Sequence, residues 1–126
     1  MSLTIKQRSI KYLIEEITKL LNMDVSWPVA IAMTESSLGI KQKSGTGARG
    51  VFQMTSIAMK DLLQEMEKQD DDIIDILCGI AFLHLLRKRW GSIEEATKHF
   101  CDPADRDFYW ERVKKYMVDL YEAETQ

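Results

Sequence analysis

Hydrophobic positions recur at helical spacing along most of the chain. Between residues 4 and 22 they return every three or four positions, and Thr4 and Gln7 have the spacing of a capping box. This pattern predicts an amphipathic helix over 4–22. Periodicity, capping residues and glycine or proline breaks predict four later helices, over about 55–68, 72–90, 92–100 and 105–122.

A further helix differs from these because its opening turns are apolar on every side. Residues 27–33 read Trp-Pro-Val-Ala-Ile-Ala-Met. A helix that is hydrophobic all round is usually buried. Ser26 is the expected N-cap, and Pro28 suits the first turn. We therefore expect a buried helix that begins at Ser26.

A glycine-rich segment follows this apolar helix. Four of the six glycines fall within twelve residues, namely Gly39, Gly45, Gly47 and Gly50. Such a density of glycine indicates turns with positive φ angles, where another molecule can approach the backbone closely. Together with the helical segments, it predicts one compact, mainly α domain over residues 1–126 with a single glycine-rich excursion.

Charge and composition exclude several classes of protein. Seventeen basic and twenty acidic residues give a net charge of -3. The protein therefore lacks the excess of positive charge that attracts a nucleic-acid backbone. The apolar run 27–33 is far shorter than the roughly 20 residues of a membrane-spanning helix. Cys78 and Cys101 permit at most one disulfide and lack metal-site spacing. We therefore expect no nucleic-acid partner, membrane insertion, metal or cofactor.

Glu35 and Gln53 are the candidates for chemistry. Glu35 lies near the end of the apolar helix, where a carboxylate is costly to ionise, and a protonated carboxylic acid is what general acid catalysis needs. The alternative is a glutamate that points into water at a helix end. The Gln53 amide can bind a polar ligand such as a sugar, or it can satisfy a nearby backbone group in a turn.

Several short motifs together resemble a known catalytic domain. Residues 34–37 read Thr-Glu-Ser-Ser, and residues 47–54 read Gly-Ala-Arg-Gly-Val-Phe-Gln-Met. Both resemble the lytic transglycosylase domain of the soluble lytic murein transglycosylase type. Residues 76–83 are similar to that family's Ile-x-x-Gly-x-x-x-Leu helix, and residues 108–113 to its late tyrosine motif. The resemblance is strongest over 26–116.

This resemblance implies a mainly α, lysozyme-like fold with a cleft and a small Gly-rich hairpin at about 39–54. It implies that Glu35 is the catalytic acid/base on the β-1,4 bond between N-acetylmuramic acid and N-acetylglucosamine, with a 1,6-anhydro sugar as product. It also implies a role for Tyr109 in orienting the Glu35 carboxyl. The substrate-binding residues that it implies are Ser36, Gly50, Phe52, Gln53, Phe100 and Tyr109.

The distribution of carboxylates supports one part of this mechanism independently. Ordinary glycosidases use two carboxylates about 5 to 9.5 Å apart. No Asp or Glu stands between Glu35 and Asp61. One acid without a partner suits intramolecular attack better than activation of water.

The chain departs from the family pattern at residues 98–103, which read Lys-His-Phe-Cys-Asp-Pro where the family has an Ala-Tyr-Asn-Ala-Gly-like stretch. Asp102 is either a turn cap before Pro103 or a second carboxylate that would make the enzyme a hydrolase, a muramidase. A non-catalytic relative that binds glycan or acts as a scaffold is a further alternative.

The expected partner is the peptidoglycan glycan strand, and the expected place of action is the cell wall, periplasmic or extracellular. No apolar stretch at the N-terminus has the form of a signal peptide. A signal was therefore either never present or removed, and a larger bacteriophage, conjugation or secretion assembly suits such a domain.

Overall fold

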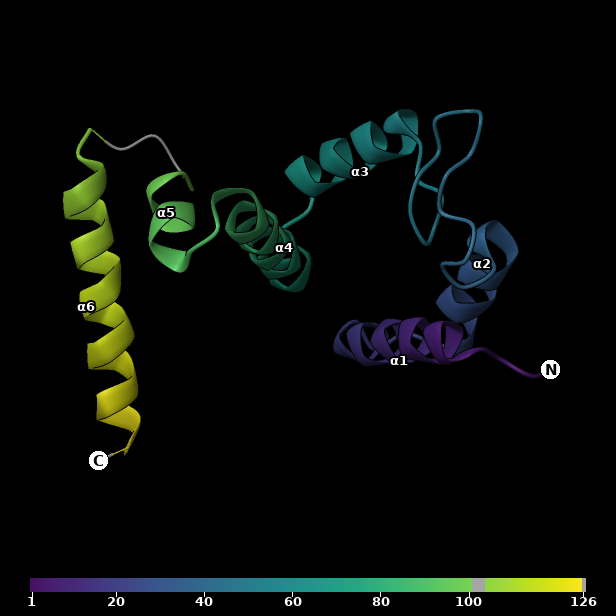
Figure 1. Cartoon of the computed structure of the whole chain (residues 1–126), viewed down its shortest axis with the longest axis horizontal. Helices are drawn as coiled ribbons and strands as arrows, with labels where there is room; N and C mark the ends of the chain where they lie inside the picture. The colour runs from purple at the N-terminus through teal and green to yellow at the C-terminus, as the bar shows by residue number, and fades with distance from the viewer. Residues whose placement is uncertain (101–103, 126) are drawn as a thin grey trace. The chain divides into compact units, whose positions relative to one another are not determined.

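The computed structural model describes residues 1–100 and 104–125, and it is mainly α, as expected for the lysozyme-like fold (Figure 1). Its described residues form no strand, and the hairpin expected at about 39–54 is reduced to two isolated bridges, Lys43 with Arg49 and Arg49 with Met54. The helices of the described chain are α1 (Ile5–Leu20), α2 (Ser26–Ser36), α3 (Ser56–Lys68), α4 (Asp72–Trp90), α5 (Ile93–Lys98) and α6 (Arg106–Thr125).

The chain forms two compact units, Met1–Ile73 and Ile74–Gln126. Each unit has its own packing and is described by itself. The expectation of a single domain over 1–126 stays a prediction.

The start of α1 is the capping box predicted from the sequence. The Gln7 N–H donates to the Thr4 hydroxyl at 3.1 Å, and the Thr4 N–H donates to Gln7 Oε1 at 2.9 Å. Gln7 Nε2 also donates to the Ser37 carbonyl at 3.0 Å. One side chain therefore begins α1 and joins it to the segment that follows α2.

The start of α2 corrects the sequence analysis. Val25 occupies the N-cap position without a side-chain bond, and Ser26 is already helical. Asp24 accepts both the Ser26 hydroxyl at 2.7 Å and the Ser26 N–H at 2.9 Å. These hydrogen bonds, the hydroxyl foremost, lower the pKa of Asp24. The carboxylate satisfies an N–H that has no partner within the helix, so Ser26 is capped rather than the cap.

The core of the first unit lies where α1, α2 and the segment after α2 meet. Its fully buried members are Ala32 at 0% and Leu38 at 1% exposure, and Ile14 of α1 completes the cluster. The opposite side of α2 is open, with Trp27 62% and Ile31 43% exposed. The expectation of a helix buried on every side is therefore wrong, because α1 and the following segment cover only one of its faces. The residues packed around the core are Leu3, Ile10, Val29, Met33, Val51 and Phe52.

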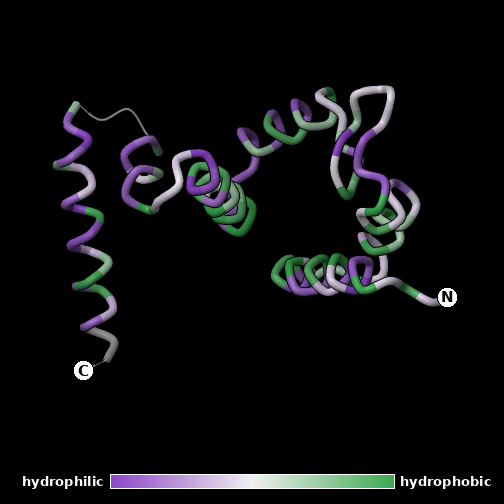
Figure 2. Tube along the Cα trace, in the orientation of Figure 1, coloured by the Kyte–Doolittle hydropathy of each residue, from purple (hydrophilic) through white to green (hydrophobic). Residues whose placement is uncertain are grey.

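The ends of the later helices follow the sequence signals closely. The Thr55 hydroxyl accepts the Ala58 N–H at 3.1 Å at the start of α3, and the Ser92 hydroxyl accepts the Glu95 N–H at 3.1 Å at the start of α5. Helix α4 ends at Trp90, and Gly91 follows with a φ of 85°. Figure 2 shows the hydrophobic residues concentrated along α4 and interspersed with hydrophilic ones along α6.

Replacing Gln7 by alanine tests the connection between α1 and the segment after α2. Loss of the side chain leaves the Ser37 carbonyl and the Thr4 N–H without this partner, so we expect the free energy of unfolding in urea to fall by about 1–3 kcal/mol. The control is Lys6→Ala, a change at an exposed neighbour in α1. Its free energy of unfolding should stay within about 0.5 kcal/mol of the wild-type value. Equal stabilities for both variants would contradict the role assigned to Gln7.

Candidate functional site

Glu35 lies in the last turn of α2 and is exposed. Trp27, Ile31 and Glu35 are four residues apart, so the three side chains form one stripe along the uncovered side of the helix. The expectation that the apolar helix buries this carboxylate is therefore wrong. Among the described residues no hydrogen bond or ion pair engages it, which leaves the carboxyl group open to a ligand.

Ser36 connects the end of α2 to the glycine-rich segment. Its hydroxyl donates to the Val51 carbonyl at 2.6 Å and accepts the Gly39 N–H at 2.9 Å. The side chain is only 1% exposed. The hydroxyl therefore positions the glycine-rich segment relative to the end of α2, and the substrate contact expected of Ser36 stays a prediction.

The Gln53 side-chain amide joins two parts of the glycine-rich segment by hydrogen bonds to their backbone. Its Nε2 donates to the Gln42 carbonyl at 2.9 Å and to the Gly50 carbonyl at 2.8 Å. Its backbone has a φ of 51°, in the left-handed region that non-glycine residues rarely adopt. Of the two readings of Gln53 from the sequence, the structure shows the amide nitrogen in the backbone-satisfying role. Oε1 is the atom left for a ligand.

Gly50 and Phe52, which precede Gln53 in the glycine-rich segment, lie in different environments. Gly50 has a φ of 84°, and a Cβ added there would meet no atom within 4 Å, so its backbone faces open space. Phe52 is half-buried and packs against the core of the first unit. Gly50 therefore has free space at its α-carbon while its N–H and carbonyl are bonded to Gln42 and Gln53, and Phe52 is anchored against the core.

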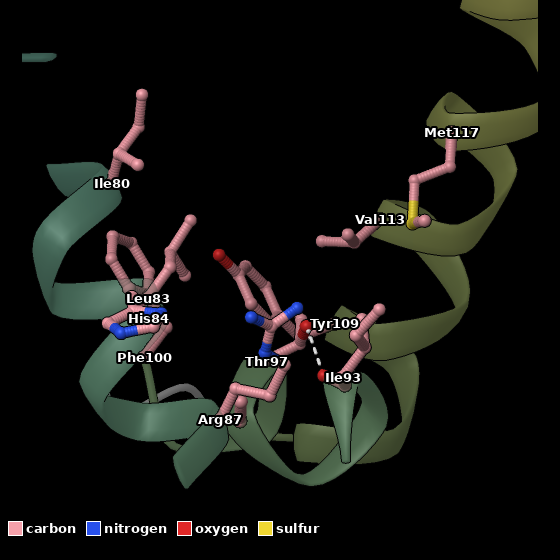
Figure 3. Close-up of a pocket in the computed structure, with 11 residues that line it drawn as sticks. Ile80, Leu83, His84, Arg87, Ile93, Thr97, Phe100, Tyr109, Val113 and Met117 are labelled. Atoms are coloured by element: carbon pink, nitrogen blue, oxygen red, sulfur yellow. Dashed lines mark hydrogen bonds between the residues drawn. The ribbon is translucent and has the colours of Figure 1, made fainter. Parts of the chain in front are cut away.

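The second unit contains a pocket of about 500 Å³ formed by α4, α5 and α6 (Figure 3). Phe100 and Tyr109 both line it, and their rings point into it from different walls. Phe100 also contacts Phe82, with 5.7 Å between ring centroids. The other lining residues are Ile80, Leu83, His84, Arg87, Ile93, Ala96, Thr97, Val113 and Met117.

An ion pair between α5 and α6 positions the Tyr109 wall of this pocket. Lys98 Nζ lies 2.9 Å from Asp107 Oδ1, and the hydrogen bond to Asp107 raises the pKa of Lys98. The Arg106 guanidinium donates to the Lys98 carbonyl. Both contacts fix the first turn of α6 against the end of α5, and Tyr109 belongs to that turn.

Sequence reasoning missed the polar residues Arg87 and Thr97 of the pocket. His84 and Arg87 are exposed on α4, and the Thr97 hydroxyl donates to the Ile93 carbonyl at 2.7 Å. The signal that could have found them is helical spacing, because Ile80, His84 and Arg87 recur every three or four residues along one face.

The site residues expected from the sequence thus form two groups. Glu35, Ser36, Gly50, Phe52 and Gln53 belong to the first unit, and Phe100 and Tyr109 to the second. The structure brings the members of each group together, while the orientation of Glu35 by Tyr109 stays a prediction. The expectations for Asp102 and for pairing of Cys101 lie outside the described residues.

Residues 1–100 and 104–125 lack two wider features. No group of three or more His, Cys, Asp or Glu side chains in this part of the chain is arranged to hold a metal ion. Nor does any helix within it have the length and apolar character needed to cross a membrane.

An exposed acid at a helix end, held beside a glycine-rich turn in a mainly α protein, defines a lysozyme-like class of domain. The family described as the transglycosylase SLT domain matches residues 12–99, more than half of the chain. The chain belongs to this family of peptidoglycan-acting domains. The match includes Glu35 and Gln53 and ends before Phe100 and Tyr109. No curated protein and no solved structure matches the chain.

Replacing Ser36 by alanine tests the connection between α2 and the glycine-rich segment. We expect the free energy of unfolding to fall by about 1–3 kcal/mol, because the buried Val51 carbonyl and Gly39 N–H both lose a partner. The matched control is Thr34→Ala, which removes an exposed hydroxyl bonded only to the Ala30 carbonyl of its own helix. Urea unfolding of both variants measures the difference, and equal values would refute the positioning role.

Proposed function

We propose that this protein is a lytic transglycosylase that cleaves the β-1,4 bond between N-acetylmuramic acid and N-acetylglucosamine in peptidoglycan. Membership of the transglycosylase SLT domain family supports the substrate. The observation that carries the proposal is the exposed Glu35 carboxyl at the end of α2, in a segment with no other Asp or Glu before Asp61.

Glu35 is proposed to act first as acid and then as base. It donates a proton to the glycosidic oxygen as the bond to the muramic anomeric carbon breaks, and the leaving sugar gains a hydroxyl. The 6-hydroxyl of the same muramic residue then bonds to that carbon, and its proton returns to Glu35. The 2-acetamido group of the substrate is proposed to assist. No water is consumed, so the product carries a 1,6-anhydro ring and needs no second carboxylate.

The neighbouring residues are proposed to hold the glycan around Glu35. Gly50 offers open space at its α-carbon, where a sugar can approach closely, and Gln53 offers its free Oε1. Phe52, half-buried against the core, would give a fixed apolar edge. Phe100 and Tyr109 are proposed as further substrate-binding residues because the family resemblance implies them, and both line the pocket of the second unit.

The cell wall is the proposed place of action, on its periplasmic or extracellular side, because the substrate is located there. Attachment to a larger bacteriophage, conjugation or secretion assembly is proposed as the means of reaching it. The net charge of -3 supports this, since an acidic protein gains no electrostatic attraction to an acidic wall.

Digestion of purified peptidoglycan tests the proposed reaction. We expect the wild-type protein to release muropeptides with 1,6-anhydro ends, one water lighter by mass spectrometry than the hydrolysis products. Glu35→Gln keeps the shape of the side chain but cannot exchange the proton, so release should fall by at least about a hundredfold. Glu16→Gln, an exposed change in α1, should retain full activity.

Other products would contradict the proposal in distinct ways. Reducing ends would show hydrolysis and direct attention to Asp102 as a second carboxylate. Absence of release, with binding to the insoluble wall retained, would show a glycan-binding relative without catalysis.

A further inference from the structure

The glycine-rich segment beside Glu35 carries charge of one sign only. Between Glu35 and Asp61 the charged residues are Lys41, Lys43, Arg49 and Lys60, in a protein whose net charge is -3. Lys41, Lys43 and Arg49 are all exposed. A local excess of cations on an acidic protein needs a specific explanation, because the overall composition does not supply one.

The backbone holds two of these cations against each other. Lys43 and Arg49 form an antiparallel bridge, and the flanking Gly50 N–H donates to the Gln42 carbonyl at 2.9 Å. A pair flanked in this way is of the non-hydrogen-bonded type, in which the two side chains leave the same face and lie closest together. Like charges directly opposite each other in such a pair are destabilising.

Nothing among the described residues neutralises the pair. The ion pairs found in residues 1–100 and 104–125 involve Lys11, Lys19, Lys68, Lys98 and Lys114, and none involves Lys43 or Arg49. The sequence around the pair offers no acid either. The repulsion therefore persists in the free protein and is relieved when an anion binds between the two side chains.

The pair is also held in place before any ligand arrives. Arg49 exchanges both backbone hydrogen bonds with Met54, at 3.2 and 3.0 Å, and the Gln53 amide joins the carbonyls of Gln42 and Gly50. Directly opposite residues share a face, so the half-exposed Met54 side chain lies beside Arg49. The result is a fixed stretch of backbone that carries two exposed cations and one apolar edge.

The same segment is connected to the residue next to Glu35. The Ser36 hydroxyl bonds to the Val51 carbonyl, and Val51 is two residues from Arg49. This hydrogen bond holds the backbone that carries Arg49 close to the end of α2, where Glu35 lies. A bidentate guanidinium with an ammonium group beside it suits a carboxylate. Two adjacent cations on an acidic protein do not suit a long polyphosphate, which needs many contacts along its backbone.

We propose that Lys43 and Arg49 bind a carboxylate of the peptide stem carried by the glycan strand. The proposal rests on the function proposed above, and it makes the peptide stem part of what the protein recognises. It follows that glycan with its stems attached is cleaved in preference to glycan whose stems have been removed.

The test compares intact peptidoglycan with the same material after an amidase has removed its peptide stems. The full chain, the double variant K43Q/R49Q and the control K60Q are assayed on both substrates, with kcat/KM taken from formation of 1,6-anhydro ends by mass spectrometry. Lys60 is an exposed cation of the same acid-free segment but belongs to α3. The wild type should prefer the intact substrate by about tenfold, the effect of one charge-assisted hydrogen bond.

The double variant should lose this preference, with a ratio near one, while K60Q keeps the wild-type ratio. The preference of the wild type should also decline at high ionic strength, since an exposed pair is screened by salt. The melting temperature of K43Q/R49Q should equal or exceed that of the wild type, because a repulsion has been removed. No preference in the wild type, or an equal preference in the double variant, would overturn the proposal.

A binding assay separates this proposal from the proposed enzyme activity. Equilibrium binding of the Glu35→Gln protein to intact peptidoglycan fragments and to stem-free glycan strands measures binding without cleavage. Greater binding to the intact substrate, lost in the triple variant E35Q/K43Q/R49Q, supports the carboxylate site even if the wild type cleaves neither substrate. Binding that depends instead on phosphate polymers attached to the wall would overturn the assignment to the peptide stem.

Discussion

The geometry around Glu35 depends on the Ser36 hydroxyl, which acts both as a hydrogen-bond donor and as an acceptor. Where α2 ends, Ser37 and Leu38 both have positive φ, a conformation that costs free energy in residues with a Cβ. Such a turn persists only where its surroundings fix it, and here one buried hydroxyl bonds to the Gly39 N–H and the Val51 carbonyl. One hydroxyl therefore connects the helix end, the tight turn and the glycine-rich segment. The position of Glu35 relative to that segment is determined by the residue beside it.

Local chemistry explains why most helix ends were predictable from the sequence. Thr4, Thr55 and Ser92 each bond to an N–H three residues ahead, so the whole interaction lies within one short stretch of chain. The exception, Ser26, is also local. Its own N–H and hydroxyl are taken by Asp24, a stronger acceptor two residues earlier, and a residue-type preference does not rank two neighbouring candidates.

The rest of the site could not be predicted because it depends on contacts between distant residues. Composition identified Glu35 as a candidate acid but not its exposure, which depends on the face of α2 that α1 covers. The family resemblance implies a substrate contact for Ser36, while its burial and its two hydrogen bonds to the glycine-rich segment become visible only in the structure. For Gln53 both readings from the sequence were physically sound, and only the positions of the Gln42 and Gly50 carbonyls distinguish them.

Gln53 also shows how a backbone preference and a side-chain requirement can conflict at one position. Its φ of 51° is tolerated better by asparagine or glycine, so the backbone alone would select against glutamine. The two carbonyls that it reaches, however, require the extra methylene that asparagine lacks and glycine has no means to replace. The identity of this residue is thus determined by length. Glutamine acts as a spacer of fixed reach, and shortening it would relax the local backbone while releasing the loop it holds.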